Sequence, residues 1–229
     1  MLDDRAVLGS LTDRAGDNPL SWVAAPLAAA GRVLEIGCAA GALADRFPAG
    51  QWLGLTATLR PGPMPRLRGS PDALPVRSGV FDGIALLLGL PRLPNVDGVF
   101  AELRRVLQPG GTLVLLVPSA LARSTRELRM ASTLAGVHRQ WRHRSALDQA
   151  GWLLAAADFA VLGDDRVSFS LPLPDQEAAQ RLVEILPRAG LWPPDLPPGV
   201  RVRAVTTLCR LSGPGRILPV PLRRLVARR

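Results

Sequence analysis

The residues from Arg32 to Ala44, RVLEIGCAAGALA, have the types and spacing that could bind a nucleotide-like ligand. An apolar run with one acidic residue, Glu35, leads into the small residues Gly37, Ala39 and Gly41. Such a run predicts a buried parallel strand that ends in a tight turn. A turn almost free of side chains lets backbone N–H groups approach a ligand closely. The Glu35 carboxylate could organise this turn or attract a cationic or hydroxylated ligand group.

The same pattern occurs in turns that bind nothing, so this segment alone leaves a structural turn and a cofactor loop equally open. Its neighbours alternate apolar runs with segments of helical spacing. The expected strands after it are 51–56, 84–88 and 112–117, and the expected helices are 20–30, 41–47 and 95–107. Residues 57–69 are rich in Pro and Arg and predict a loop. Asp82 is expected to close the start of its strand. This alternation predicts a parallel sheet covered on both faces.

Three segments, in this order and at these intervals, resemble the class I S-adenosylmethionine-dependent methyltransferases of the ubiquinone-biosynthesis type: VLEIGCAAGALA, LPVRSGVFDGIALLLGL and ELRRVLQPGGTLVLLVP. The third is the most specific, because a Pro-Gly-Gly break between a helix and a strand is rarer than a glycine turn. The resemblance covers roughly residues 30–120. It implies an α/β fold with a Rossmann-like, doubly wound, seven-stranded, mostly parallel sheet whose last strand is antiparallel.

The resemblance also implies which residues hold the methyl donor, S-adenosylmethionine. Those at its methionine end would be Glu35, Gly37, Cys38, Ala39 and Gly41; those near the ribose Thr56 and Ala57; those near the adenine Ser70, Pro71 and Asp72; and Leu87 would lie at the end of the fourth strand. Thr56 stands where the family has an acid that grips both ribose hydroxyls, so donor affinity should suffer. Where relatives often have a pair of histidines, this chain reads Gly-Leu-Pro-Arg at 89–92.

The region after Ser119 should supply the acceptor side. Residues 119–145 have helical spacing and are basic, and they contain His138, Trp141 and His143. Both histidines of the chain lie here and are its only bases suited to neutral pH, while Trp141 could stack on an aromatic or isoprenoid acceptor. Solvated histidines and an apolar helix anchor are the alternative for these three residues. Beyond them we expect a late helix and a sixth strand within 146–163, a helix at 175–189 and a closing strand at 200–211.

All 28 basic residues are arginine, and their distribution is uneven. Residues 1–120 carry 11 Arg against 10 acids, and residues 121–229 carry 17 Arg against 9 acids. We expect a helical lead-in at 1–31, a methyltransferase domain at 32–212 with an acceptor-side insert at about 119–145, and a basic amphipathic tail at 213–229. Such a tail could lie on an anionic membrane, and a disordered or self-docked terminus fits it as well.

Several classes of protein are disfavoured. No uninterrupted apolar run reaches the length of a membrane span, and the acidic, polar start does not resemble a signal peptide. A cytoplasmic protein is therefore expected, with peripheral contact to the inner face of a membrane as an option. Cys38 and Cys209 lie far apart and offer no metal-ligand spacing, so we expect small buried residues there and no metal.

The sequence therefore predicts an S-adenosylmethionine-dependent methyltransferase that acts on a small-molecule or lipid-like acceptor at oxygen or carbon. A non-catalytic subunit that keeps the fold for binding or scaffolding is the first alternative, supported by Thr56, Ser70 and the Pro91–Arg92 pair. An RNA methyltransferase is the second. It is disfavoured, because no RNA-binding module accompanies the basic charge.

Overall fold

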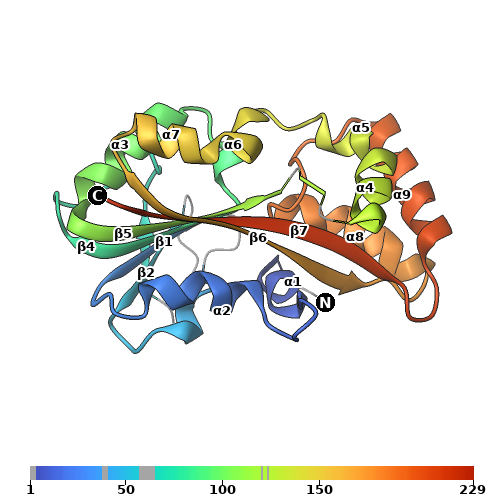
Figure 1. Cartoon of the computed structure of the whole chain (residues 1–229), viewed down its shortest axis with the longest axis horizontal. Helices are drawn as coiled ribbons and strands as arrows, with labels where there is room; N and C mark the ends of the chain where they lie inside the picture. The colour runs from blue at the N-terminus through green and yellow to red at the C-terminus, as the bar shows by residue number, and fades with distance from the viewer. Residues whose placement is uncertain (1–3, 38–40, 57–64, 120, 123) are drawn as a thin grey trace.

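Seven strands form one sheet in the order β3-β2-β1-β4-β5-β7-β6 (Figure 1). The computed structural model describes residues 4–37, 41–56, 65–119, 121–122 and 124–229. The strands are β1 (Val33–Gly37), β2 (Trp52–Thr56), β3 (Arg66–Arg68), β4 (Phe81–Leu87), β5 (Leu107–Pro118), β6 (Ala160–Pro172) and β7 (Ile217–Arg228). Neighbouring strands from β3 to β5 are parallel, and β7 is antiparallel to both β5 and β6. The expected sheet, with its last strand antiparallel, is confirmed.

Helices cover both faces of the sheet and extend beyond one end of it (Figure 1). They are α1 (Asp4–Ser10), α2 (Pro19–Ala24), α3 (Val96–Val106), α4 (Thr125–Thr133), α5 (Ala135–His138), α6 (Ser145–Asp148), α7 (Ala150–Ala156), α8 (Gln176–Arg188) and α9 (Pro198–Leu211), with short 3-10 turns η1 (Ala25–Leu27), η2 (Ala44–Arg46) and η3 (Leu90–Arg92). α3, α6 and α7 lie on one face, α1 and α2 on the other, and α4, α5, α8 and α9 gather at one end. No described helix combines the length and apolar character needed to cross a bilayer.

The two faces of β1 serve two separate hydrophobic clusters. Leu34 and Ile36 belong to the cluster that includes the buried face of α3. Val33 belongs to the other cluster, together with Val23 of α2 and Leu27 of η1. Successive side chains of a strand point to opposite faces, so a fully apolar strand can be buried on both. The run at the start of the chemistry-bearing segment is therefore a central strand.

Local capping signals account for the helices that the sequence predicted well. The Asn95 side chain accepts a hydrogen bond from the Gly98 N–H at 3.0 Å, which begins α3 close to the expected position. The Asp175 side chain does the same for Ala178 at 2.7 Å at the start of α8. Asp82 accepts hydrogen bonds from the N–H groups of residues 31 and 32, so its expected structural role is confirmed.

Two local expectations in the first half are wrong. Residues 41–47 do not form the expected helix, because a turn and the short η2 occupy them. Residues 66–68, expected within a loop, form β3 and pair in parallel with β2 at the sheet edge. Residues 57–64 of that expected loop lie outside the described residues.

The segment 200–211, predicted as the closing strand, is instead the helix α9. Its sequence, VRVRAV, alternates apolar and charged residues like a strand, but the buried positions are Val200, Ala204, Thr207 and Leu208. These are spaced four, three and one residues apart, which is the period of a helix. Packing against α8 therefore overrides the local preference of valine for strands.

The expected surface tail at 213–229 is wrong, and the self-docked alternative holds, because residues 217–228 form β7 inside the sheet. β7 lies between β5 and β6, and residues such as Leu222 and Leu225 are fully buried. Two of its arginines, Arg223 and Arg224, are accommodated because their side chains reach acids of β6. Arg223 contacts Asp164, and Arg224 contacts Asp165 at 2.8 Å. These basic residues are thus part of the core of the sheet rather than a membrane anchor.

Candidate active site

A single buried carboxylate organises the turn after β1. Glu35 is fully buried, and its Oε1 accepts hydrogen bonds from the N–H groups of Gly41 and Ala42, each at 2.9 Å. Its Oε2 accepts from the Leu43 N–H at 3.0 Å and from the indole Nε1 of Trp52 at 2.8 Å. Burial raises the pKa of Glu35, while these four donors act against the rise. Because all four donors belong to the protein, Glu35 fixes the turn rather than reaching outward.

Glycines lie at the ends of β1 and β4, the two central strands. Gly37 of β1 pairs with Leu87 of β4, and a Cβ on Gly37 would overlap the Leu87 carbonyl oxygen and lie 2.9 Å from its Cβ. Gly89 follows close by, since a Cβ there would lie 4.0 Å from the Gly37 Cα. Gly41 has a φ of 93°, which favours glycine. Leu88, although fully buried, has a φ of 55°. Strained backbone of this kind concentrates at functional sites.

The candidate ribose and adenine residues follow the adjacent strands. Thr56 is the last residue of β2, and its carbonyl accepts a hydrogen bond from the Gly69 N–H at 3.1 Å. One residue further on, the Ser70 hydroxyl donates to the carboxylate of Asp72. Ser70 is exposed, whereas Pro71 and Asp72 are partly buried. The structure thus brings the candidate adenine residues to the end of β2. Cys38, Ala39 and Ala57 lie outside the described residues.

An ion pair on α3 holds the segment that follows Asp72. The Glu102 carboxylate accepts a hydrogen bond from the Leu74 N–H at 2.8 Å and pairs with Arg105 at 2.7 Å. Arg105 in turn donates to the carbonyl oxygens of Leu74 at 3.0 Å and Val76 at 2.8 Å. The Arg105 guanidinium lowers the pKa of Glu102. This pair fixes the position of the candidate adenine segment from the side of the helix.

The residues after β4 connect the sheet to the helices of the second half. In η3, Arg92 donates to the carbonyl oxygen of Pro187 in α8 at 3.2 Å. The carbonyl oxygen of Pro91 accepts from the His143 N–H at 3.3 Å. These residues occupy the position where the resemblance expects histidines. They hold α8 and the segment before α6 in place and offer no base.

A largely apolar cavity of about 340 Å³ lies at the carboxyl end of β5. Its wall combines Pro118 and Ser119 at the end of β5 with residues of α4, α5, α8 and the start of β7. The apolar lining includes Met130, Leu134, Leu186, Leu191, Trp192 and Leu218. The polar lining is limited to Ser119, Glu127, His138, Arg139 and Arg144. A concave apolar hollow with a few convergent polar groups is the usual form of a small-molecule site.

Of the three candidate acceptor residues, only His138 lines this cavity. Burial, with the nearby charge of Arg144, lowers the pKa of His138, so the imidazole is neutral at pH 7. Trp141 is buried, with an exposed fraction of 4%, and His143 is partly buried; neither is part of the cavity lining. The Nε1 of Trp141 and the Nε2 of His143 are buried, and neither has a hydrogen-bond partner among the described residues. The structure therefore separates His138 from its two sequence neighbours.

Sequence reasoning missed Glu127, which is buried in the cavity wall with an exposed fraction of 6%. The local signal was present, because Ser124 and Glu127 have the spacing of a helix capping box. The Ser124 side chain accepts a hydrogen bond from the Glu127 N–H at 3.2 Å and begins α4. That cap fixes the turn of α4 from which Glu127 faces the cavity. The contribution of β7 to the wall has no local signal, because its arginine-rich sequence is equally typical of a surface tail.

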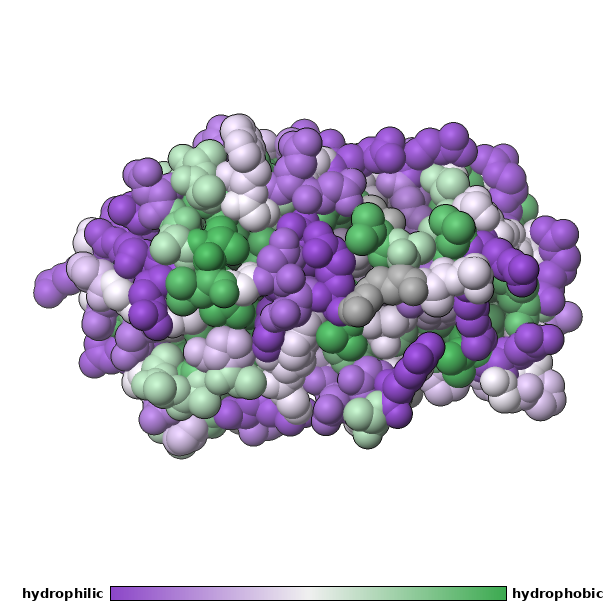
Figure 2. Space-filling model, in the orientation of Figure 1, coloured by the Kyte–Doolittle hydropathy of each residue, from purple (hydrophilic) through white to green (hydrophobic). Residues whose placement is uncertain are grey.

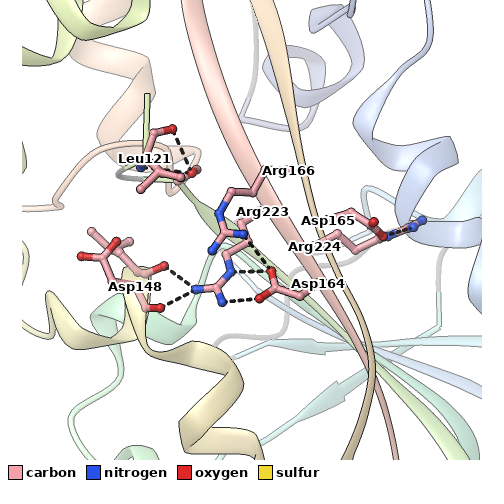
Figure 3. Close-up of polar contacts among 9 residues, drawn as sticks. Leu121, Asp148, Asp164, Asp165, Arg166, Arg223 and Arg224 are labelled. Carbon is pink, nitrogen blue, oxygen red and sulfur yellow. Dashed lines mark hydrogen bonds and ion pairs between the residues drawn. The ribbon is translucent and has the colours of Figure 1, made fainter. Parts of the chain in front are cut away.

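A buried arginine links β7 to the helices beside the cavity (Figure 3). Arg223 is 4% exposed and donates two hydrogen bonds to Asp164 of β6, at 2.7 and 2.6 Å. Its remaining guanidinium nitrogen donates to the carbonyl oxygens of Leu147 and Asp148 in α6, at 3.0 and 2.8 Å. The hydrogen bonds from Arg223, together with its charge, lower the pKa of Asp164. The hairpin β6–β7 and the helix α6 are thus joined by one side chain.

Within the described residues, no group of three or more His, Cys, Asp or Glu side chains could hold a metal ion. Cys209 is a free thiol on α9 whose Sγ lies 3.8 Å from the carbonyl oxygen of Gln176, so it is a packed residue there. The described residues at this edge of the sheet offer backbone amides, hydroxyls, the carboxylates of Glu35, Asp72 and Glu127, the neutral imidazole of His138 and the guanidinium groups that line the cavity.

Comparisons with known proteins agree with this architecture. A family model described as "Methyltransferase domain" matches residues 7–163. A 2-phytyl-1,4-naphtoquinone methyltransferase of Synechocystis sp. is 30% identical over 113 residues, which are 48% of this chain and 46% of that protein. The ubiquinone/menaquinone biosynthesis C-methyltransferase UbiE of Methylobacterium nodulans is 40% identical over 48 residues, 21% of this chain and 19% of that protein. The match thus spans less than half the length of either relative.

Solved structures support the fold over most of the chain. The [4+2]-cyclase SpnF gives a TM-score of 0.57 at 17% identity, with 92% of this chain and 79% of that chain covered. A geranyl diphosphate methyltransferase in complex with S-adenosylmethionine gives a TM-score of 0.50 at 14% identity, with 92% and 84% covered. At such identities only the fold is comparable, and one of the two proteins is named for a different reaction.

Proposed function

We propose, from the premise that this chain belongs to the methyltransferase domain family and is a class I S-adenosylmethionine-dependent methyltransferase, that it methylates a small-molecule or lipid-like acceptor on oxygen or carbon. The observation that carries the proposal is the apolar cavity at the carboxyl end of β5. It lies at the same edge of the sheet as the ends of β1, β2 and β4, where a donor would lie in a fold of this type.

The described residues fit the donor by their chemistry. Gly37 and Gly89 let the ends of β1 and β4 pack closely, because the space of a Cβ at either position is taken by Leu86 and Leu87. The donor would lie against the small residues of the turn that follows β1. The Thr56 hydroxyl would bind the ribose, and the Asp72 carboxylate would accept from the adenine amino group. Glu35 would hold the turn amides in place and not contact the donor itself. When bound, S-adenosylmethionine supplies an electrophilic methyl group on a positively charged sulfur.

The cavity residues would position the acceptor and take its proton. The apolar wall would exclude water from the acceptor ring or chain and hold it in line for displacement. Because burial keeps His138 neutral, its free ring nitrogen would accept a proton from an acceptor hydroxyl or carbon acid. Ser119, at the end of β5, would hydrogen-bond an acceptor oxygen. Catalysis would depend chiefly on positioning.

An apolar aromatic acceptor such as a quinol fits this wall better than a polar metabolite. Its lining has six large apolar side chains and few polar groups. The two curated relatives are both named for quinone methylation, which favours the same class of acceptor. We expect the protein to act in the cytoplasm, and at the inner face of a membrane where the acceptor is a lipid.

Calorimetric titration with S-adenosylmethionine tests the donor half of the proposal. Wild-type protein should bind the donor weakly, and Thr56→Asp should bind it about tenfold more tightly, because a carboxylate makes charge-assisted bonds to both ribose hydroxyls. Thr56→Asn is the matched control, since it adds polar atoms without charge, and it should leave the affinity within about threefold. The absence of heat from both wild type and Thr56→Asp would contradict the proposal.

A non-catalytic binding subunit is the second candidate, and Thr56 in place of the ribose-binding acid is the observation that favours it. Transfer of a labelled methyl group to a short-chain naphthoquinol separates the two. Transfer that is abolished by His138→Ala supports the enzyme. Donor binding without transfer to naphthoquinols, catechols or RNA supports the binding subunit.

A further inference from the structure

The arginines of the second half are concentrated on the end of the molecule formed by α4, α5 and α9. Residues 124–144 carry five arginines and one acid, Glu127, and residues 198–211 carry three arginines and no acid. Glu127 is buried, so it does not offset this charge at the surface. By contrast α8, which packs against α9, carries two glutamates and two arginines. At this end of the fold the excess of charge thus belongs to residues 124–144 and to α9, where, among the described residues, Arg201 alone pairs with an acid of α8, Glu184 at 3.5 Å.

Three of these arginines line one surface groove. A hollow of about 350 Å³ between α4, α5 and α9 is lined by Arg139, Arg203 and Arg210, with hydroxyl residues and no acid. No acid of the described chain forms an ion pair with any of the three. Three like charges held together without a counterion create a strong positive potential, which favours an anionic partner.

Exposed apolar side chains accompany the charge. Leu128 on α4 has an exposed fraction of 61%, and Val202 on α9 has one of 63%. Each is followed in sequence by an arginine, Arg129 or Arg203. Figure 2 shows hydrophilic residues along the rim of this end of the molecule, with hydrophobic residues between them. Apolar anchors among arginines are the composition of surfaces that lie on anionic bilayers.

The groove adjoins the apolar cavity. Leu134, Ala135 and Arg139 line both hollows, so the short helix α5 with its two flanking residues lies between them. A protein docked on this face would therefore bring its acceptor cavity to the bilayer surface.

We propose that the α4–α5–α9 face, defined by Arg139, Arg203, Arg210, Leu128 and Val202, docks on an anionic lipid bilayer. RNA is the weaker partner for this face. Base stacking needs exposed aromatic rings, and the one large exposed aromatic side chain among the described residues, Trp152, is on α7. The exposed leucine and valine instead suit insertion among lipid headgroups. Docking itself does not depend on the proposed function. Only its biological role, access to a lipid-like acceptor in the membrane, rests on that function.

Vesicle binding of the full chain, without donor or turnover, tests the proposal separately from methyl transfer. The protein should bind phosphatidylcholine vesicles that contain about 30% phosphatidylglycerol, and should not bind pure phosphatidylcholine vesicles. Arg203→Gln with Arg210→Gln should weaken binding by about 25-fold, because each arginine near an anionic surface strengthens binding by roughly fivefold.

The matched control is Arg32→Gln with Arg228→Gln, which removes the same charge from exposed positions at the opposite edge of the sheet. It should leave vesicle binding within about twofold of wild type. Leu128→Ser with Val202→Ser should weaken binding while leaving its salt dependence unchanged. Equal losses in the two arginine pairs, no binding to anionic vesicles, or tighter binding to poly-uridine RNA than to vesicles would each overturn the proposal. Unchanged circular dichroism and melting temperature establish that the variants fold.

Discussion

Replacing the buried carboxylate of Glu35 by an amide should uncouple the turn after β1 from the rest of the protein. In Glu35→Gln one oxygen still accepts hydrogen bonds, but the other becomes an NH₂ group. Whichever oxygen is replaced, two N–H groups then face the new NH₂ group and lose their hydrogen-bond acceptor. These are the N–H groups of Gly41 and Ala42, or those of Leu43 and the Trp52 indole. Size and shape are unchanged, so the effect reports on hydrogen bonding alone.

The expected cost follows from the number of bonds. A hydrogen bond to a charged group contributes about 1.5–3 kcal/mol, so the loss of two amounts to roughly 3–6 kcal/mol. Burial already disfavours the charged form of Glu35, as its raised pKa indicates, so the amide relieves part of this cost. We therefore expect a net loss near the lower limit. A loss of about 3 kcal/mol confined to the turn corresponds to a donor affinity weaker by about two powers of ten.

Calorimetry with S-adenosylmethionine and urea unfolding should be measured on Glu35→Gln and on Trp52→Phe. The phenylalanine variant removes the indole N–H group and leaves the Glu35 carboxylate with its three backbone N–H partners. It should lose stability from the smaller core side chain but keep donor affinity within about tenfold. Donor affinity of Glu35→Gln within threefold of wild type would refute the view that this carboxylate organises the binding turn.

Four further predictions concern the sheet and the cavity. Arg223→Met should lower the unfolding free energy by about 3 kcal/mol and Asp164→Asn by about 1, because only the first also frees the α6 carbonyls; equal losses would contradict this. Arg223 lowers the pKa of Asp164 below its usual 3.8 through its hydrogen bonds and its charge. The stabilisation from this ion pair is therefore present above pH 3.8 and is lost as the pH falls through the folded-state pKa of Asp164. When the pH drops below about 4, the urea midpoint of wild type should decrease more than that of Asp164→Asn. Gly37→Ala should cost about 2–4 kcal/mol in urea unfolding, because its Cβ overlaps β4 backbone that cannot move aside; a loss below about 0.5 would show that the strands can separate. Arg144→Gln should raise the pKa of His138 and shift the acidic limb of kcat/KM to higher pH, and an unmoved limb would exclude this imidazole as the proton acceptor.

The first half of the fold could be predicted because its signals are local. Glu35 lies within an apolar run that ends at Gly37 and is typical of a strand buried on both faces, and the Asn95 side chain caps the helix after β4. The break at 109–111 separates α3 from the apolar part of β5 as expected. Each of these features depends on residues within about ten positions of one another.

The second half could not be predicted in the same way, because its elements depend on distant partners. Arg223 can be buried in a strand only because the Asp164 carboxylate of the neighbouring strand accepts its hydrogen bonds, from a position 59 residues earlier in the chain. The alternation of Val200 to Val205 satisfies a strand, and only the burial of Ala204 and Leu208 against α8 decides for a helix. A local pattern contains no information about such partners.

The same difference between local signals and distant partners holds for the candidate site. The turn residues were recognised from one continuous motif, whereas the cavity wall is assembled from five separate elements. Closeness in sequence predicts that His138, Trp141 and His143 act together on the acceptor. The end of α5 directs only the first of them into the cavity, and Glu127 reaches it from another helix.

The position of β7 has a consequence for how the protein is made. It is the last of the described strands to be synthesised, yet it forms the bridge between β5 and β6. While a ribosome is still translating the residues before Ile217, β5 has one unpaired edge and β6 has no neighbour among the strands of the sheet. Unpaired strand edges promote aggregation. Nascent chains stalled before this strand should therefore depend on chaperones that shield exposed edges, and release of the final strand should end that dependence.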